Sequence, residues 1–313
     1  MPVVLISGGT GLIGSHLTSH LIERGFDVII LSRSKNLSSE NPKLSYSYWS
    51  VKDKIIDAEV IKKSDYIIHL AGTGVMDKKW TSEYKKLIVD SRTKSAQLII
   101  NCLKENHHHV KTFVSASAIG WYGEDGKSPE RKEGFIETDL PSNDFLGETC
   151  VLWEASTEPV TELGVRLVKL RTGIVLTNEG GAFKEYKRPL NFGVAPILGN
   201  GKQVVSWIHI DDLCRMYAEA IENGYLHGSY NAVAPKPVTQ KDLILTLGQK
   251  IRNKFFIPVY VPSFILKIIF GKRSIEILKS ATVSDKKIKA TGFTFLYPSI
   301  ESAIDELVAN PSK

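Results

Sequence analysis

Residues 3–14 read VVLISGGTGLIG, a short apolar strand that runs directly into a glycine-rich turn. Gly8, Gly11 and Gly14 have the spacing GxxGxxG, and an amphipathic helical pattern follows them. Glycines let a ligand approach the backbone closely, and the unpaired N–H groups at the start of a helix attract negative charge. A second apolar strand at residues 27–31 completes a βαβ pattern. This context favours a dinucleotide site over an ordinary glycine-rich surface loop.

Apolar strands alternate with helical stretches through the first half of the chain. This order predicts an α/β fold, with a parallel sheet that carries helices on both faces. Right-handed crossovers then make the sheet doubly wound. The expected strands are residues 3–7, 27–32, 44–48, 66–70, 112–116 and 166–170, and the expected helices are residues 14–24, 58–63, 82–105 and 144–163.

The regular alternation stops after Arg171, where a glycine-rich stretch begins. We predict a nucleotide-binding domain over residues 1–175, to which the chain returns at about 203–234. Residues 176–202 and 235–313 are expected to form a smaller α/β substrate lobe over the carboxyl ends of the strands, where ligands of such sheets bind. The apolar segment Val259–Phe270 is too short to span a bilayer, so we expect a core helix or a pocket wall.

Composition is that of a soluble globular protein, with 42% hydrophobic and 24% charged residues. The net charge of +6 is spread along the chain, which argues against a nucleic-acid partner, and no segment predicts a membrane partner. Cys102, Cys150 and Cys214 lack metal-ligand spacing and suggest reduced thiols in the cytoplasm. The first strand begins too early for a secretion signal. His107, His108 and His109 are expected in a solvated turn, so no metal site is predicted.

The residues after the second strand predict which dinucleotide binds. A site for NAD places an Asp or Glu there, which accepts hydrogen bonds from the ribose. This chain has Ser32, Arg33, Ser34 and Lys35 instead, and these residues suit the 2′-phosphate of NADP(H). A basic surface turn without a ligand is the alternative. Trp49 could flank an adenine, although a core or rim position is favoured.

The strand at residues 66–70 ends in small residues. Leu70, Ala71 and Gly72 there would let a flat ring or a ribose lie against the backbone. We expect these residues to form the next part of the cofactor site.

Several motifs together identify a family resemblance. With the glycine turn, they are His69-Leu70-Ala71-Gly72, Ser115-Ala116-Ser117-Ala118, Tyr122-Gly123, Leu170-Arg171 and residues 207–212, WIHIDD. Over nearly the whole chain, the sequence resembles the extended short-chain dehydrogenase/reductase family, the NAD-dependent epimerase/dehydratase superfamily. It looks closest to an atypical branch of uncharacterised epimerase-family and cell-division-inhibitor-like proteins, which have their own short C-terminal domain.

The resemblance implies a Rossmann-type nucleotide-binding domain. A homodimer is a separate expectation. Combined with the motifs above, the resemblance gives a set of residues expected to touch the cofactor. These are Gly8, Thr10, Gly11, Leu12, Ile13, Gly14, Ser32, Arg33, Ser34, Leu70, Ala71, Gly72, Arg92 and Cys150.

The family's usual catalytic pair is missing. Active members use a Ser together with YxxxK, in which the Lys lowers the pKa of the Tyr and the Tyr transfers a proton. When Glu154 is aligned with the Glu that often follows the family's Lys, Leu146 occupies the Tyr slot and Cys150 the Lys slot. Cys150 is expected to be a small buried hydrophobe rather than a reactive thiol. Arg92 takes the place of an Asn that orders a water relay in the family.

Two hydroxyl groups remain as catalytic candidates. Ser117 matches the Ser that polarises the substrate oxygen, and Tyr122 lies in a loop expected beside the nicotinamide. Without a Lys nearby, the Tyr122 phenol should keep a pKa near its ordinary value and act as an acid. A hydroxyl bonded to backbone and a pocket-wall tyrosine are equally open alternatives. Arg171 and residues 207–209 match pocket segments of the family, and His209 is expected to be structural.

The sequence therefore predicts an NADP(H)-dependent oxidoreductase or epimerase that acts on a small carbonyl or hydroxyl substrate without the Tyr-Lys pair. The alternative is a non-catalytic NADP(H) sensor that reports redox state through closure of the lobe. A nucleic-acid or cell-division partner protein is a weaker hypothesis, which the dispersed charge does not support.

Overall fold

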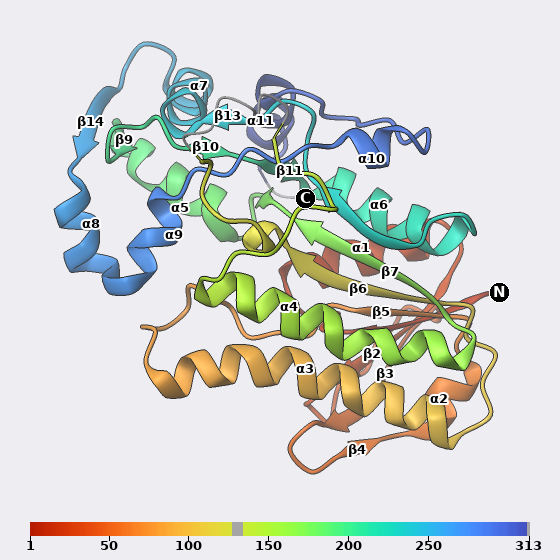
Figure 1. The fold of residues 1–313 in the computed structure, drawn as a ribbon. Coiled ribbons are helices and arrows are strands. Elements are labelled where there is room, and N and C mark those ends of the chain that lie inside the picture. Colours follow the sequence, from red (N-terminus) through yellow and green to blue (C-terminus); the bar gives the residue numbers. More distant parts are fainter. Residues whose placement is uncertain (127–133, 312–313) are drawn as a thin grey trace.

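The computed structural model describes residues 1–126 and 134–311. Its centre is a sheet of eight strands in the order β12-β7-β6-β5-β1-β2-β3-β4 (Figure 1). All neighbouring strands run parallel except β4, which pairs antiparallel with β3. The strands are β1 (Val3–Ser7), β2 (Asp27–Ser32), β3 (Leu44–Ser50), β4 (Ile55–Ile56), β5 (Tyr66–His69), β6 (Thr112–Ala118), β7 (Arg166–Thr172) and β12 (Gly228–Ala232).

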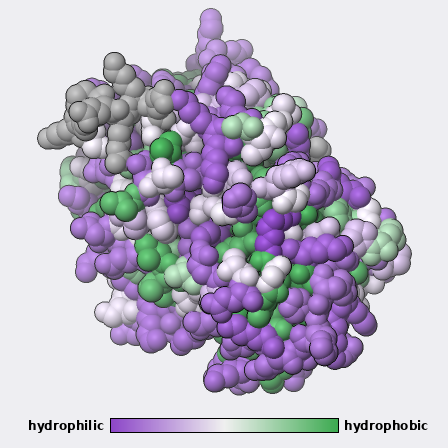
Figure 2. Space-filling model, turned by 45° about the vertical axis from the view of Figure 1, so that its right-hand side comes forward, coloured by the Kyte–Doolittle hydropathy of each residue, from purple (hydrophilic) through white to green (hydrophobic). Residues whose placement is uncertain are grey.

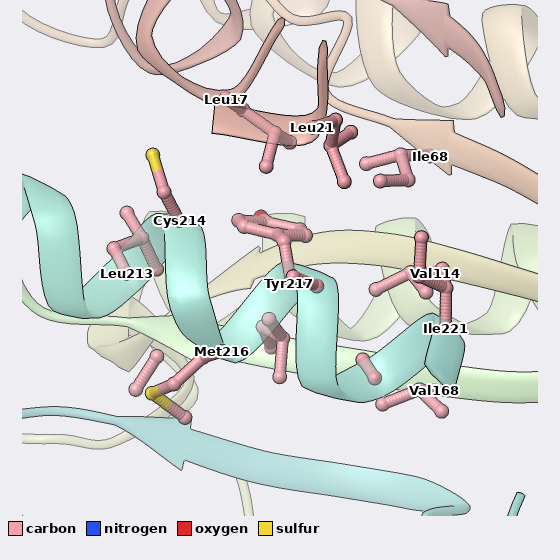
Figure 3. Close-up of a cluster of buried hydrophobic side chains, with 14 of the residues drawn as sticks. Leu17, Leu21, Ile68, Val114, Val168, Leu213, Cys214, Met216, Tyr217 and Ile221 are labelled. Atoms are coloured by element: carbon pink, nitrogen blue, oxygen red, sulfur yellow. The ribbon is translucent and has the colours of Figure 1, made fainter. Parts of the chain in front are cut away.

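Helices cover both faces of this sheet, because successive residues of a buried strand point to opposite sides. Ile6 of β1 faces α1 (Leu12–Glu23) and α6 (Ile210–Glu222), whose side chains meet in the cluster drawn in Figure 3. Leu5 faces the other layer. That layer contains α2 (Ala58–Lys63), α3 (Ser82–Glu105) and the 3₁₀ helix η2 (Glu158–Leu163), and α4 (Phe145–Thr157) packs beside α3. The doubly wound α/β fold predicted from the sequence is thus confirmed.

The later part of the chain builds a smaller α/β unit above the carboxyl ends of the strands (Figure 1). A separate cluster that includes Phe183, Trp207 and Leu247 forms its core. Three short strand pairs are β8 (Ile174–Leu176) with β11 (Trp207–His209), β9 (Val194–Leu198) with β14 (Ile257–Val261), and β10 (Val204–Val205) with β13 (Val238–Thr239). The helices are α5 (Gly181–Leu190), α7 (Gln240–Arg252), α8 (Ser263–Phe270), η3 (Gly271–Arg273), α9 (Ser274–Leu278), α10 (Lys286–Lys289) and α11 (Ile300–Ala309).

Two expectations about local structure need correction. The helix expected over residues 144–163 divides into α4 and η2, because Pro159 cannot donate a backbone hydrogen bond and stands at the start of the second piece. The segment Val259–Phe270 is not a core helix. It forms the end of β14 and then α8, in which Phe264 is 62% exposed and Ile268 is 78% exposed. Of the large apolar side chains of α8, Leu266 is the one that is fully buried.

The surface and the helix lengths bear on possible partners. On the face drawn in Figure 2, hydrophilic residues cover most of the surface and hydrophobic residues lie between them. Among the residues described, no helix is both long enough and apolar enough to pass through a bilayer.

Candidate functional site

The glycine turn between β1 and α1 leaves no room for a side chain at Gly8 or Gly14. A Cβ atom on Gly14 would lie 2.3 Å from the carbonyl oxygen of Gly8. Gly8 itself has a φ of +75°, which strains other residues. Helix α1 begins after Gly11, and no side chain caps its first N–H groups. The turn is therefore a cradle of backbone N–H groups that fits a pyrophosphate.

Other parts of this turn lie where a ligand could reach them. Thr10 is exposed, and Leu12 and Ile13 are half-buried at the start of α1. The loop after β8 comes close to them, since a Cβ atom on Gly180 would lie 3.2 Å from a methyl group of Leu12. Thr10, Leu12 and Ile13 thus remain accessible, and their contact with a cofactor stays a prediction.

The end of β5 lies against the glycine turn. The N–H of Leu70 donates to the carbonyl of Ser7 at 2.9 Å, and a Cβ atom on Gly8 would lie 2.8 Å from the carbonyl carbon of Leu70. The ring of His69 is 2.6 Å from the Ser7 hydroxyl, and burial lowers the pKa of His69 to about 4, so the ring is neutral. The structure therefore places Leu70 and Ala71 beside the glycine turn.

The end of β2 presents two cations. The Ser32 hydroxyl accepts the backbone N–H of Ser34 at 3.0 Å, which shapes the turn, and Arg33 is exposed. The ammonium group of Lys35 lies 4.8 Å from the ring centroid of Tyr48, which stands opposite Ser32 on β3. Trp49, the next residue, is buried in the hydrophobic core, the alternative that its sequence context favours.

Helix α4 brings Leu146 and Cys150 to the carboxyl end of β6. The 3₁₀ helix η1 (Ile119–Trp121) lies on them, since a Cβ atom on Gly120 would be 3.3 Å from Cβ of Leu146 and 3.7 Å from Sγ of Cys150. The Cys150 Sγ lies 3.6 Å from the carbonyl oxygen of Ala118. Burial raises the pKa of the Cys150 thiol to about 12, so the thiol stays protonated. Cys150 is thus the buried hydrophobe expected from the sequence.

The Ser117 hydroxyl donates its hydrogen to Oε1 of Glu154 at 2.7 Å. The same carboxylate accepts two hydrogen bonds from the Arg171 guanidinium, at 2.8 and 3.0 Å. Burial alone would raise the pKa of Glu154, but the hydrogen bonds and charge of Arg171 outweigh it and hold that pKa below its usual range. In this structure, the Ser117 hydroxyl therefore donates its hydrogen to an ionised carboxylate inside the protein, that of Glu154.

Tyr122 is fully buried and stacks on Phe135. Its hydroxyl donates to Oδ1 of Asn231 at 2.7 Å and accepts from Nη1 of Arg171 at 3.1 Å. Burial raises the pKa of Tyr122 to about 12, so the ordinary pKa expected from the sequence is wrong. The sequence shows no lysine near this phenol, but it does not show that the ring lies inside the protein, where its charged form is disfavoured.

Arg92, on α3, lies beside Gly72. A Cβ atom on Gly72 would be 3.1 Å from the Cζ of Arg92. The guanidinium also lies over the Trp153 ring of α4, 4.8 Å from its centroid. The structure thus brings Arg92, Cys150 and the end of β5 together, whereas Ser32 to Ser34 lie at the end of the more distant strand β2.

Two residues that sequence reasoning did not assign complete this site. Glu154 follows Cys150 by one helical turn, which identifies the helix but does not show that the carboxylate points toward Ser117. Asn231, on β12, holds the Tyr122 hydroxyl across 109 residues of chain. Only the order of strands in the sheet brings such residues together, so no local signal could have revealed the second contact.

His209 has the structural role expected from the sequence, because both of its ring nitrogens have partners within the protein. The Nε2 atom of His209 lies 3.0 Å from a carboxylate oxygen of Glu306, and its Nδ1 accepts the N–H of Asp211 at the start of α6. Within residues 1–126 and 134–311, no group of three or more His, Cys, Asp or Glu side chains could hold a metal ion.

Comparison with known proteins agrees with these features. Residues 4–146 match the model of the NAD dependent epimerase/dehydratase family, and residues 261–307 match a Domain of unknown function (DUF1731). An epimerase family protein of Staphylococcus haemolyticus is 34% identical over 309 residues, which cover 98% of this chain and 99% of that protein. One of Staphylococcus aureus is 33% identical over 311 residues, covering 99% of this chain and all of its own length.

Solved structures show the same fold over most of the chain. A human epimerase family protein, solved with NADPH, has a TM-score of 0.85 at 27% identity, covering 98% of this chain and 99% of its own. A nucleoside-diphosphate sugar epimerase from Corynebacterium glutamicum has a TM-score of 0.75 at 28% identity, covering 97% of this chain and 57% of its own.

Proposed function

Because the chain belongs to the NAD dependent epimerase/dehydratase family, we propose that it is an NADP(H)-dependent oxidoreductase or epimerase that acts on a small carbonyl or hydroxyl compound. The observation that carries the proposal is the start of α1, where Gly14 lets the helix lie directly on the backbone of Gly8 and no side chain caps the first N–H groups, so that these groups can bind a pyrophosphate. Bound there, the cofactor would supply hydride transfer at its nicotinamide ring. The residues at the end of β5 would flank the nicotinamide half of the cofactor.

The choice of NADP(H) over NAD(H) rests on Ser32, Arg33 and Lys35, where a guanidinium and an ammonium group replace the usual carboxylate. The human relative that was solved with NADPH supports this choice. We expect Arg33→Ala to weaken NADPH binding by about 1.5–3 kcal/mol, the range for a hydrogen bond to a charged group. NADH binding should stay nearly unchanged. Calorimetric titration measures both, with Lys52→Ala as the matched exposed control, and equal losses for the two cofactors would overturn the assignment.

The source of the substrate proton departs from the Tyr-Lys chemistry. Ser117 and Tyr122 are the proposed hydroxyl groups, but each donates its hydrogen to an internal acceptor in this structure. For either to act on a substrate, its hydrogen bond has to exchange from Glu154 or Asn231 to the substrate oxygen. We expect the Ser117→Ala, Tyr122→Phe double variant to lose turnover and to keep its cofactor affinity. Undiminished turnover would reject both residues.

A second candidate function is a non-catalytic NADP(H) sensor. It is favoured by the same two internal hydrogen bonds and by the neutral thiol that Cys150 places in the Lys slot. NADPH carrying deuterium at the transferable position of the nicotinamide distinguishes the two functions. With a panel of carbonyl compounds, an enzyme transfers the label to a product, whereas a sensor binds the cofactor and releases the label unchanged.

The remaining expectations concern the surroundings of the protein. The three cysteines are buried and form no disulfide. This agrees with a reducing compartment, and we propose the cytoplasm. The homodimer and the assignment of residues 176–202 and 235–313 to a substrate lobe stay predictions.

A further inference from the structure

Arg92 is a buried cation without a negatively charged partner. Only 8% of the residue is exposed. Its Nη1 atom donates to the carbonyl oxygens of Thr73 and Ile88, at 3.0 and 2.9 Å. Within the described residues no Asp or Glu forms an ion pair with it, and burial lowers the pKa of its guanidinium. Buried charges in proteins are normally paired with an opposite charge. Because Arg92 has no such partner, no ion pair compensates its positive charge.

The charge of Arg92 lies at the nicotinamide end of the proposed site. Its Cζ fills the space directly beside Gly72, 3.1 Å from where a Cβ atom of that residue would stand. On its other side are Trp153 and Cys150, the residue in the family's Lys slot. The nearest buried carboxylate of α4, Glu154, is already neutralised by two hydrogen bonds from Arg171 and by Lys169, whose Nζ is 3.6 Å away. Glu154 therefore does not compensate the charge of Arg92.

We infer that Arg92 makes the site selective for the reduced cofactor, NADPH, over NADP⁺. The inference rests on the proposed function, which places the nicotinamide beside Gly72. The oxidised ring carries a positive charge and the reduced ring is neutral, so a fixed cation opposes the oxidised form alone. Two unit charges about 10 Å apart at an effective dielectric of about 20 change a binding constant by roughly tenfold.

This selectivity gives the site a way to respond to redox state, because a ligand shifts a protein only through differential affinity. At a fixed total concentration of cofactor, occupancy follows the share that is reduced. In a reductase, the same selectivity speeds the exchange of spent NADP⁺ for NADPH. In a sensor, the change in cofactor occupancy is the signal.

Calorimetric titration with NADPH and with NADP⁺ tests the inference. The variants are Arg92→Gln, which removes the charge, and Arg92→Lys, which keeps it. The matched control is Arg166→Gln, since the Arg166 guanidinium also donates to backbone carbonyl groups but lies at the start of β7, at the amino end of the sheet. We expect the unchanged protein, Arg92→Lys and Arg166→Gln to bind NADPH about tenfold or more tightly than NADP⁺. In Arg92→Gln the two dissociation constants should become nearly equal.

The outcomes separate the inference from the proposed function. If the unchanged protein binds neither nucleotide, the proposed function fails and the inference fails with it. If both nucleotides bind with the same affinity, or if Arg92→Gln keeps the preference, the inference alone is overturned. If Arg92→Gln does not fold, titration of the unchanged protein with both nucleotides at 1 M NaCl tests the inference instead. A preference caused by a buried charge persists at this salt concentration, and one caused by surface charges disappears.

Discussion

At the scale of single residues, the chain shows that a glycine can be required by space as well as by backbone angle. Gly8 needs a positive φ, whereas Gly14 is helical and is excluded from carrying a side chain by the backbone of the turn. Both requirements follow from the close approach of α1 to the preceding strand. This close approach explains why glycine stands at Gly8 and Gly14 of the GxxGxxG spacing.

Gly14→Ala should therefore remove nucleotide binding. Its new Cβ atom would meet the carbonyl oxygen of Gly8 at 2.3 Å, a distance that forces the turn to move. Overpacking of a well-packed core costs about 1–3 kcal/mol, and here the neighbour that has to move is backbone. Gly224→Ala is the control, because a Cβ atom there meets nothing within 4 Å. NADPH titration and thermal unfolding of both variants check the prediction, and tight binding by Gly14→Ala would contradict it.

At the scale of elements, β6, β7 and α4 are joined by one buried polar network. Ser117 of β6 and Arg171 of β7 both bond to the Glu154 carboxylate of α4. The Arg171 guanidinium also lies 3.7 Å from the centroid of the Trp121 ring in η1. This network fixes α4 against the sheet, so it sets where Leu146 and Cys150 stand in the site.

Removing one charge from this network should destabilise the protein strongly. Glu154→Gln leaves the Arg171 guanidinium buried without its counter-ion, and breaking a buried pair in this way costs about 3–5 kcal/mol. Urea unfolding at pH 7 measures the loss. Glu59→Gln is the control, because its partner Lys62 is held on the surface, and we expect little change there. Equal losses in the two variants would contradict a structural role for the network.

The same carboxylate predicts how stability depends on pH. The folded-state pKa of Glu154 is held below the ordinary value of 4.5. Its contribution to stability is therefore fully present above pH 4.5 and is lost as the pH falls through the folded-state pKa. The free energy of unfolding should decrease on acidification below about pH 4.5, and less steeply in Glu154→Gln than in the unchanged protein. Urea titrations between pH 7 and pH 3 compare the two slopes, and parallel slopes would exclude Glu154 as the group responsible.

At the scale of the whole molecule, the late part of the chain is tied to the loop after β6. The carboxylate of Asp125 accepts hydrogen bonds from the hydroxyl groups of Ser280 and Thr282 and from the N–H of Thr282, at 2.8–2.9 Å. Nearby, Lys279 forms an ion pair at 2.8 Å with Asp144, the residue that caps α4. Residues 279–282 are thus bonded to the loop that carries Tyr122 and to the start of α4.

Asp125→Ala should loosen this connection. Its loss leaves the groups of residues 280–282 without their acceptor, and hydrogen bonds to a charged group contribute about 1.5–3 kcal/mol. We expect faster amide hydrogen exchange in residues 280–283, with no change in α1. Asp53→Ala serves as the control, since Asp53 bonds locally to Ser50. Unchanged exchange in residues 280–283 would show that other contacts hold the segment.

The sequence by itself determined the α/β architecture, the glycine turn and the cations after β2. These features are written in contiguous residues, because strand alternation, helical period and turn chemistry are local properties. It did not determine that α8 is exposed, since apolar composition shows a tendency to be buried but not which neighbours are present to bury it.

Only the tertiary structure decided what the candidate site residues can do. The hydrogens of Ser117 and Tyr122 are donated to Glu154 and Asn231, which lie 37 and 109 residues further along the chain. Arg92 lacks a carboxylate because of what packs around α3, and its own segment, DSRT, has an aspartate two residues away that pairs outward with Lys86 and Lys94. Proton donation and charge compensation depend on which atoms meet in space, and distant parts of the chain supply those atoms.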